Sequence, residues 1–311
     1  MKTGYLIILA TTLLIAILML ANNKTLDYNL YLSHNGIERR SIVHVPDKIV
    51  KEKLPLVIVF HGLFGNSTYT KDTYGITELS DKKGFISVYP EGTGQLDNAL
   101  LSWNVEFCCG YAMENKIDDV GYITELLTLI KQRYNVDNDR IYLIGFSNGG
   151  MLTYKLISEH PELFTAAAIV SSSPSGGSSE GSIIHIEPPK KSFPLIIFHG
   201  ERDTIIPYHG GFSGEENSSG IFFSSILESV ERWANSMDAL IVEENFTDQE
   251  KVIVRKYLNE NNHVIIEFYT LKEEGHTFPG RIKGFQSFFQ ENQVYLDAKE
   301  LIWDFFESHS N

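Results

Sequence analysis

One segment constrains the fold more than any other, because in it a buried strand, a sharp glycine turn and a helix follow each other directly. Ile141–Phe146 is a short apolar run that predicts a strand, and Gly149–His160 predicts a helix that Pro161 stops. Between them, Ser147 is the centre of a G-x-S-x-G motif. Such a turn needs small residues around the serine and lifts its hydroxyl above the sheet, at a helix N-terminus. We expect Ser147 to be a nucleophile; the alternative is a plain glycine-rich turn.

The rest of the chain alternates short apolar strands with helices. This alternation predicts an α/β fold with a mostly parallel central sheet covered by helices on both faces, in a single domain over residues 26–311. Two segments rich in Ser and Gly, 171–181 and 208–220, are interpreted as surface loops after strand ends. The other predicted strands are Ser41–Val45, Leu56–Phe60, Phe85–Tyr89, Ala166–Val170, Leu195–His199, Lys251–Tyr257 and Val264–Tyr269. The other predicted helices start at Asp118, span about Ile221–Met237, and include Leu301, Ile302 and Phe305.

Residues 1–25 are predicted to be a signal peptide or an uncleaved signal anchor. Lys2 precedes an apolar run of about 17 residues, from Tyr5 to Ala21, at the short end for a membrane span and the long end for a signal core. The bulky Met19 near the end of the run leaves cleavage open. We therefore expect a secreted or extracytoplasmic protein, or one that this segment anchors to a membrane.

Because the chain is predicted to be exported, its cysteines could form disulfides. The sequence has two, Cys108 and Cys109, and they are adjacent. Two neighbouring cysteines exclude a framework of several disulfides. Because ordinary disulfides join Cα atoms that are farther apart than neighbours are, two alternatives stay open: two free thiols or a vicinal disulfide.

Composition and spacing exclude several classes of function. The chain has 26 Lys and Arg residues against 40 Asp and Glu residues, a formal net charge of −14, whereas a nucleic-acid binder presents a basic face. No set of His, Cys, Asp and Glu residues has the spacing of a metal site, and no glycine-rich phosphate-binding motif is present. We expect neither a nucleic-acid partner nor a metal nor a cofactor.

A serine nucleophile needs a base that a carboxylate orients, and in α/β-hydrolases the chain order is Ser, acid, His. Asp203 lies just past the strand Leu195–His199, where the acid is expected. Glu201 is closer to the strand end, and Asp238 lies at a helix end, so both are weaker candidates. The alternative interpretation of Asp203 is a turn cap.

The base is predicted to be His276, which lies after the last strand in the glycine-flanked loop Gly275–Gly280. The other histidines downstream of Asp203 are less well placed. They are His209, which follows the acid too closely, His263 in a tight turn, and His309 at the C-terminus.

The oxyanion hole is expected to use two backbone N–H groups. Asn148, directly after the nucleophile, supplies one, and Leu63 supplies the other from the His61–Gly65 loop after the strand Leu56–Phe60. His61 is interpreted mainly as a structural hydrogen-bonding residue. Trp103, in a loop after a strand, is a candidate for lining an acyl or aryl pocket, and we treat both Trp103 and His61 as candidate substrate contacts.

Several unrelated motifs occur in a fixed order along residues 40–305. They are His61-Gly62, Trp103 before Cys108-Cys109-Gly110, Asp118-Asp119-Val120-Gly121, Gly145–Gly150, His199-Gly200 with Asp203, Trp233-Ala234, and Gly275-His276. In these motifs the chain resembles the polyhydroxybutyrate depolymerase and feruloyl esterase group of α/β-hydrolases, although its oxyanion loop is less glycine-rich than in many members. The resemblance implies an α/β-hydrolase fold and an exported serine esterase whose nucleophile, acid and base are Ser147, Asp203 and His276.

The expected activity is therefore carboxylic-ester hydrolysis through an acyl-enzyme. The resemblance implies esters of plant-wall polysaccharides, feruloyl or acetyl, or hydroxyalkanoate polyesters and oligomers as substrates. Two other classes stay open: a serine peptidase on the same scaffold, and a catalytically silent binding protein. A silent protein usually lacks a member of the triad, whereas all three are present in this sequence.

Overall fold

The computed structural model describes residues 26–46, 53–96, 99–214, 220–247, 250–280 and 296–310. The predicted signal segment, residues 1–25, lies outside these ranges. Within them, no helix has both the length and the apolar character that crossing a membrane requires.

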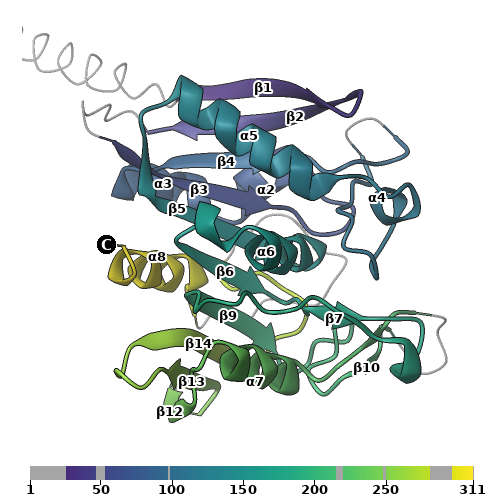
Figure 1. The fold of residues 1–311 in the computed structure, drawn as a ribbon, viewed down its shortest axis with the longest axis vertical. Coiled ribbons are helices and arrows are strands. Elements are labelled where there is room, and N and C mark those ends of the chain that lie inside the picture. The colour runs from purple at the N-terminus through teal and green to yellow at the C-terminus, as the bar shows by residue number, and fades with distance from the viewer. Residues whose placement is uncertain are drawn as a thin grey trace, which may run out of the picture.

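The described residues form a ten-stranded sheet (Figure 1). Its six central strands are parallel, and an antiparallel pair is added at each edge. In sheet order the strands are β1 (Leu26–His34), β2 (Ile37–Val45), β4 (Ile86–Pro90), β3 (Leu54–Phe60), β5 (Val136–Phe146), β6 (Ala166–Val170), β9 (Leu195–Gly200), β14 (Val264–Leu271), β13 (Val252–Leu258) and β12 (Ile241–Thr247).

Helices cover both faces of the sheet, as the sequence predicts (Figure 1). Side chains of α5, α6 and α7 share one hydrophobic cluster with one face, and side chains of α3 and α8 share a second cluster with the other. The helices are α2 (Ser67–Thr73), α3 (Ile76–Lys83), α4 (Tyr111–Glu114), α5 (Asp119–Arg133), α6 (Asn148–Glu159), α7 (Ile226–Ser236) and α8 (Ala298–Ser308). The short elements are η1 (Pro161–Leu163), η2 (Glu180–Ser182), β7 (Ser175–Gly176), β8 (Ile184–His185), β10 (Gly211–Phe212) and β11 (Phe222–Phe223).

The start of α7 differs from the expected helix over about Ile221–Met237. Phe222–Phe223 form β11, which pairs with β10, and the helix begins only at Ile226. The hydroxyl of Ser225 accepts a hydrogen bond from the N–H of Glu228 and so caps the helix N-terminus. A serine followed three residues later by glutamate is a known start signal, and it marks this boundary in the sequence.

The central strands bring the functional loops to one edge. Leu56–Phe60 on β3 is buried to 1% exposure or less, as expected for a strand that is covered on both faces. Because β5, β9 and β14 are parallel members of one sheet, the loops that follow them emerge at the same edge. These loops carry the three residues predicted to act together.

Candidate active site

The turn between β5 and α6 holds Ser147 in a conformation that few residues adopt. Its backbone has φ 54° and ψ −123°, and its side chain is almost buried. A Cβ at Gly145 would lie 2.4 Å from the carbonyl oxygen of Gly149, and one at Gly149 would lie 2.5 Å from the carbonyl oxygen of His61. The glycines on either side are therefore required for this turn, as the motif predicts.

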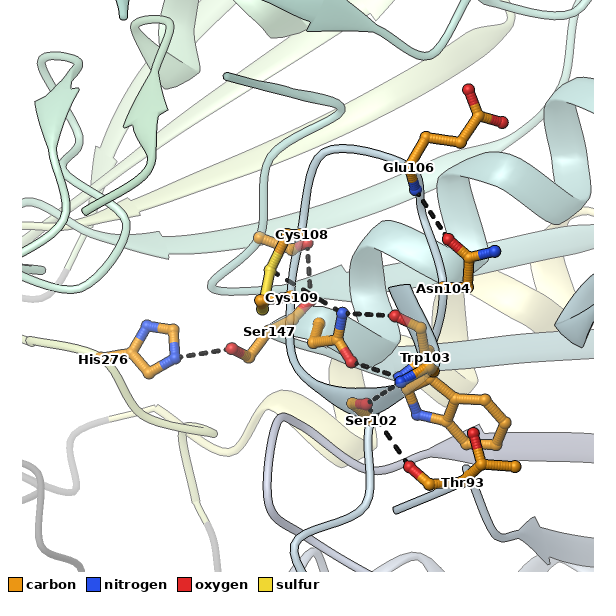
Figure 2. The surroundings of a disulfide bond; sticks show 12 residues. Thr93, Ser102, Trp103, Asn104, Glu106, Cys108, Cys109, Ser147 and His276 are labelled. Atoms are coloured by element: carbon orange, nitrogen blue, oxygen red, sulfur yellow. Dashed lines mark hydrogen bonds between the residues drawn. A yellow bond between two sulfur atoms is a disulfide. The ribbon is translucent and has the colours of Figure 1, made fainter. Parts of the chain in front are cut away.

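The structure brings the three predicted side chains into one hydrogen-bonded chain. His276 Nε2 lies 2.9 Å from the hydroxyl oxygen of Ser147, and its Nδ1 lies 2.8 Å from Oδ2 of Asp203. Figure 2 shows the imidazole of His276 pointing at Ser147. Since a carboxylate only accepts, Nδ1 of His276 donates to Asp203 and leaves Nε2 as the acceptor for the serine proton. Three groups that are remote in sequence thus meet with the geometry of a nucleophile, a base and an orienting acid.

Asp203 is held as an anion by several donors. Its Oδ1 accepts hydrogen bonds from the N–H groups of Ile205 and Ile206, each at 2.9 Å. Burial alone would raise the pKa of Asp203, but the attraction of His276 and the hydrogen bonds hold it below its ordinary value. The carboxylate is therefore charged at neutral pH and keeps the imidazole of His276 in one orientation.

The two backbone N–H groups expected to form the oxyanion hole lie in the loop next to Ser147 and directly after it. Within the ranges that the structure describes, the N–H groups of Leu63 and Asn148 have no hydrogen-bond partner. Gly62 lets the Leu63 loop approach the nucleophile, because a Cβ there would lie 3.2 Å from Cβ of Ser147. The Phe64 N–H donates to the carbonyl of Leu101 at 2.8 Å and so fixes the loop.

The expectation that Trp103 and His61 contact substrate is not met, because both side chains are completely buried. Trp103 Nε1–H donates to the carbonyl of His61 at 2.9 Å. His61 Nδ1 donates to the carbonyl of Gly62 at 2.7 Å, and its Nε2 accepts from the N–H of Gly92 at 2.9 Å. The structural interpretation of His61 fits these contacts: both residues fix the backbone of the loop that carries Leu63.

The side chain of Asn148 has a second role that sequence reasoning missed. Its Oδ1 accepts from the backbone N–H of Trp103 at 2.8 Å, and its Nδ2 donates to the carbonyl of Trp103 at 3.0 Å. The same Nδ2 lies 3.9 Å from Sγ of Cys108. In the structure Cys108 and Cys109 form the vicinal disulfide, which decides between the two alternatives left open by the sequence (Figure 2). Asn148 therefore ties the nucleophile turn to the cysteine loop.

The serines after β6 are a further feature that the sequence analysis misread. The expected surface loop over residues 171–181 is buried as far as residue 177. The Ser172 hydroxyl donates to the carbonyl of Ser147 at 2.8 Å, and the Ser171 hydroxyl donates to the carbonyl of Thr277 at 3.0 Å. Because β6 lies between β5 and β9 in the sheet, its following loop braces both the nucleophile turn and the histidine loop.

Three of the alternative bases and acids, His309, His263 and Asp238, lie at other positions in the fold. His309 hydrogen-bonds the carbonyl of Val264 at the beginning of β14, whereas His276 follows the end of that strand. His263 directly precedes β14 as well, and Asp238 follows the end of α7. Among the described residues, no group of three or more His, Cys, Asp and Glu side chains could hold a metal ion.

Part of the chain also matches a model of a known protein family. Residues 40–187 match the family model described as "Esterase PHB depolymerase". Over this region, just under half of its length, the chain is similar to that family. The matched region contains Leu63, Ser147 and Asn148 but ends before Asp203 and His276. The acid and base assignments therefore depend on the distances in the structure.

Among curated relatives, feruloyl esterase B of Neurospora crassa is 30% identical over 137 residues, 44% of this chain and 45% of the relative. Feruloyl esterase B of Piromyces equi is 29% identical over 203 residues, 63% of this chain and 35% of the relative. A bifunctional acetylxylan esterase/xylanase of Neocallimastix patriciarum is 26% identical over 180 residues, 58% of this chain and 24% of the relative. The chain thus spans less than half the length of these relatives.

Solved structures support the fold. An acetyl xylan esterase from Aspergillus awamori superposes with a TM-score of 0.58 at 16% identity, covering 90% of this chain and 99% of that one. An S-formylglutathione hydrolase from Agrobacterium tumefaciens gives a TM-score of 0.56 at 12% identity, covering 93% and 97%. At these identities the likeness concerns the fold alone, and the predicted α/β-hydrolase fold is confirmed.

Proposed function

We propose that the chain is a serine carboxylic-ester hydrolase that works through an acyl-enzyme. The observation that carries this proposal is the continuous hydrogen-bonded chain from the Ser147 hydroxyl through His276 to Asp203. His276 Nε2 takes the serine proton as the hydroxyl oxygen attacks the ester carbonyl carbon. The resulting imidazolium is stabilised by the Asp203 carboxylate.

The N–H groups of Leu63 and Asn148 then stabilise the negative oxygen of the tetrahedral intermediate. His276 returns its proton to the leaving alcohol oxygen, and the carbon–oxygen bond to the alcohol breaks. A water molecule, deprotonated by His276, attacks the acyl-serine, and the acid is released as Ser147 recovers its proton. Each step uses groups that the structure brings together, so no cofactor is needed in this proposal.

The proposed substrates are esters of plant-wall polysaccharides, acetyl or feruloyl, with hydroxyalkanoate polyesters and oligomers as the second class. Relatives named feruloyl esterase and acetylxylan esterase support the first class, and the family description supports the second. We propose that residues 26–311 are one catalytic domain and that residues 1–25 export it or anchor it at a membrane.

The deciding experiment measures hydrolysis of p-nitrophenyl acetate by Ser147→Ala. We expect loss of hydrolysis and of labelling by a fluorophosphonate probe, with an unchanged circular dichroism spectrum. Ser33→Ala, at an exposed serine on β1, is the matched control and should keep both. Full activity of Ser147→Ala would refute the nucleophile assignment.

Two further measurements address the alternative functions. Faster cleavage of a matched p-nitroanilide than of the p-nitrophenyl ester would favour a peptidase. A folded wild-type protein that neither hydrolyses esters nor reacts with the probe would favour a silent binding protein.

A further inference from the structure

His199 is a buried histidine that the proposed reaction does not use. It lies near the end of β9, pairs with Thr270 on β14, and its side chain has no exposed surface. It precedes Asp203 by four residues, so the strand end and the acid loop place the two side chains next to each other.

The hydrogen bonds of His199 determine which of its nitrogens carries the proton. Nε2 lies 2.9 Å from the carbonyl oxygen of Ile206, and a carbonyl oxygen only accepts, so Nε2 is the donor. The same Nε2 lies 3.4 Å from Oδ2 of Asp203, which is the oxygen that accepts from His276 Nδ1. Oδ2 of Asp203 therefore accepts the N–H of His276, whereas the N–H of His199 is bonded to Ile206 and lies beside this oxygen.

Burial and its neighbours keep His199 neutral. Burial lowers the pKa of His199, the Asp203 carboxylate opposes this shift, and His276 adds to it. Its Nδ1 has no hydrogen-bond partner among the described residues. Among the described residues, Tyr208 also lies near the ring, and its hydroxyl is 3.0 Å from the hydroxyl of Thr270. The imidazole thus offers Asp203 one N–H dipole without a second full positive charge.

We propose that His199 is a positioning residue whose neutral Nε2–H, bonded to Ile206 beside the Asp203 carboxylate, holds the acid loop and so helps to set the pH at which His276 can act as a base. This inference rests on the proposed esterase function. The His199 N–H offsets part of the carboxylate charge, so a protonated His276 beside it is held less tightly. Its bond to Ile206 also closes the turn whose N–H groups bind the other oxygen of Asp203.

The test compares His199→Gln with His199→Phe. The amide nitrogen of glutamine reaches about as far as Nε2 and keeps the donor, whereas phenylalanine fills the space and donates nothing. We measure kcat/KM for p-nitrophenyl acetate against pH. For His199→Phe we expect the acid limb to move up by about half a pH unit, with about a tenfold loss at the optimum. His199→Gln should keep the acid limb of the wild type.

A purely structural role would lower kcat/KM equally at every pH, and that result would overturn the proposal. An equal shift of the acid limb in both variants would also overturn it, because the donor would then not be the cause. If His199→Phe does not fold, the tautomer itself is measured in the wild type by NMR with nitrogen-15 histidine. We expect His199 to be neutral with its proton on Nε2; an Nδ1–H or a doubly protonated ring contradicts the inference. Ester hydrolysis by the same wild-type sample tests the proposed function separately.

Discussion

The close approach of the Leu63 loop to the nucleophile predicts that Gly62→Ala disables catalysis without unfolding the protein. A Cβ at Gly62 would lie 2.9 Å from Cδ1 of Phe146 and 3.2 Å from Cβ of Ser147, where ordinary contacts begin at 3.4 Å. The ring of Phe146 cannot yield freely, because it packs against Tyr74 and His276. The loop must therefore retreat by about half an ångström, and the N–H of Leu63 with it.

A displacement of that size weakens one oxyanion hydrogen bond substantially, because such bonds are effective only at about 2.7–3.1 Å. Loss of one donor typically costs about 10²–10³ in kcat, or about 2.7–4 kcal/mol of transition-state stabilisation. We expect a fall of this order in kcat for p-nitrophenyl acetate, with little change in KM. Overpacking should also cost about 1–3 kcal/mol of unfolding free energy, measured in urea.

Gly181→Ala is the matched control, since a Cβ there has nothing within 4 Å. It should keep the kcat of the wild type. A folded Gly62→Ala variant whose kcat/KM stays within about threefold of the wild type would show that the Leu63 N–H does not act in the oxyanion hole.

Three further predictions follow from the buried polar groups. Asp203→Asn should lower kcat by about 10⁴-fold, because an amide donor at Nδ1 of His276 places the proton on Nε2; near-normal kcat in a steady-state assay would contradict this. Burial lowers the pKa of His61 to about 4, and its Nε2 already accepts from Gly92, so the unfolded chain binds a proton before the folded one does. The free energy of unfolding should therefore fall by up to about 1.4 kcal/mol per pH unit from about pH 6.5 to about pH 4, as measured in urea at each pH; a flat profile in that window would contradict this. Asp119→Asn breaks a buried ion pair with Arg39, 2.6 Å apart, and should cost about 3–5 kcal/mol in urea unfolding at neutral pH; a cost below about 1 kcal/mol would mean that the pair contributes little.

The meeting of Ser147, His276 and Asp203 was predictable because its signals are local and ordered along the chain. The turn around Ser147 needs small residues at fixed positions, and Asp203 and His276 each follow a strand that its apolar run identifies. The alternation of strands and helices likewise predicts the parallel centre of the sheet. Because the strands before Ser147, Asp203 and His276 are parallel in one sheet, these three residues then meet at one edge of it.

The misread features depend on contacts between distant residues. From the sequence, Trp103 is a loop residue that could line a pocket. In the structure its indole N–H donates to the carbonyl of His61, 42 residues away. The serines after β6 have a surface composition, yet they are buried because their hydroxyls bind backbone carbonyls of two other loops. Strand β12 is exposed along its whole length and shows no apolar alternation, so only its pairing with β13 defines it.

The order of the strands has a consequence for how activity arises during folding. Ser147 and His276 are 129 residues apart in sequence, but β5 and β14 are separated in the sheet only by β6 and β9. Three spacings of about 4.8 Å between neighbouring strands therefore separate β5 from β14, and this pairing closes the long segment of chain between Ser147 and His276. Such non-local pairings form late and slowly. Recovery of ester hydrolysis after dilution from denaturant should thus report the completion of the whole parallel sheet, because a chain that ends before β14 contains Ser147 but lacks His276.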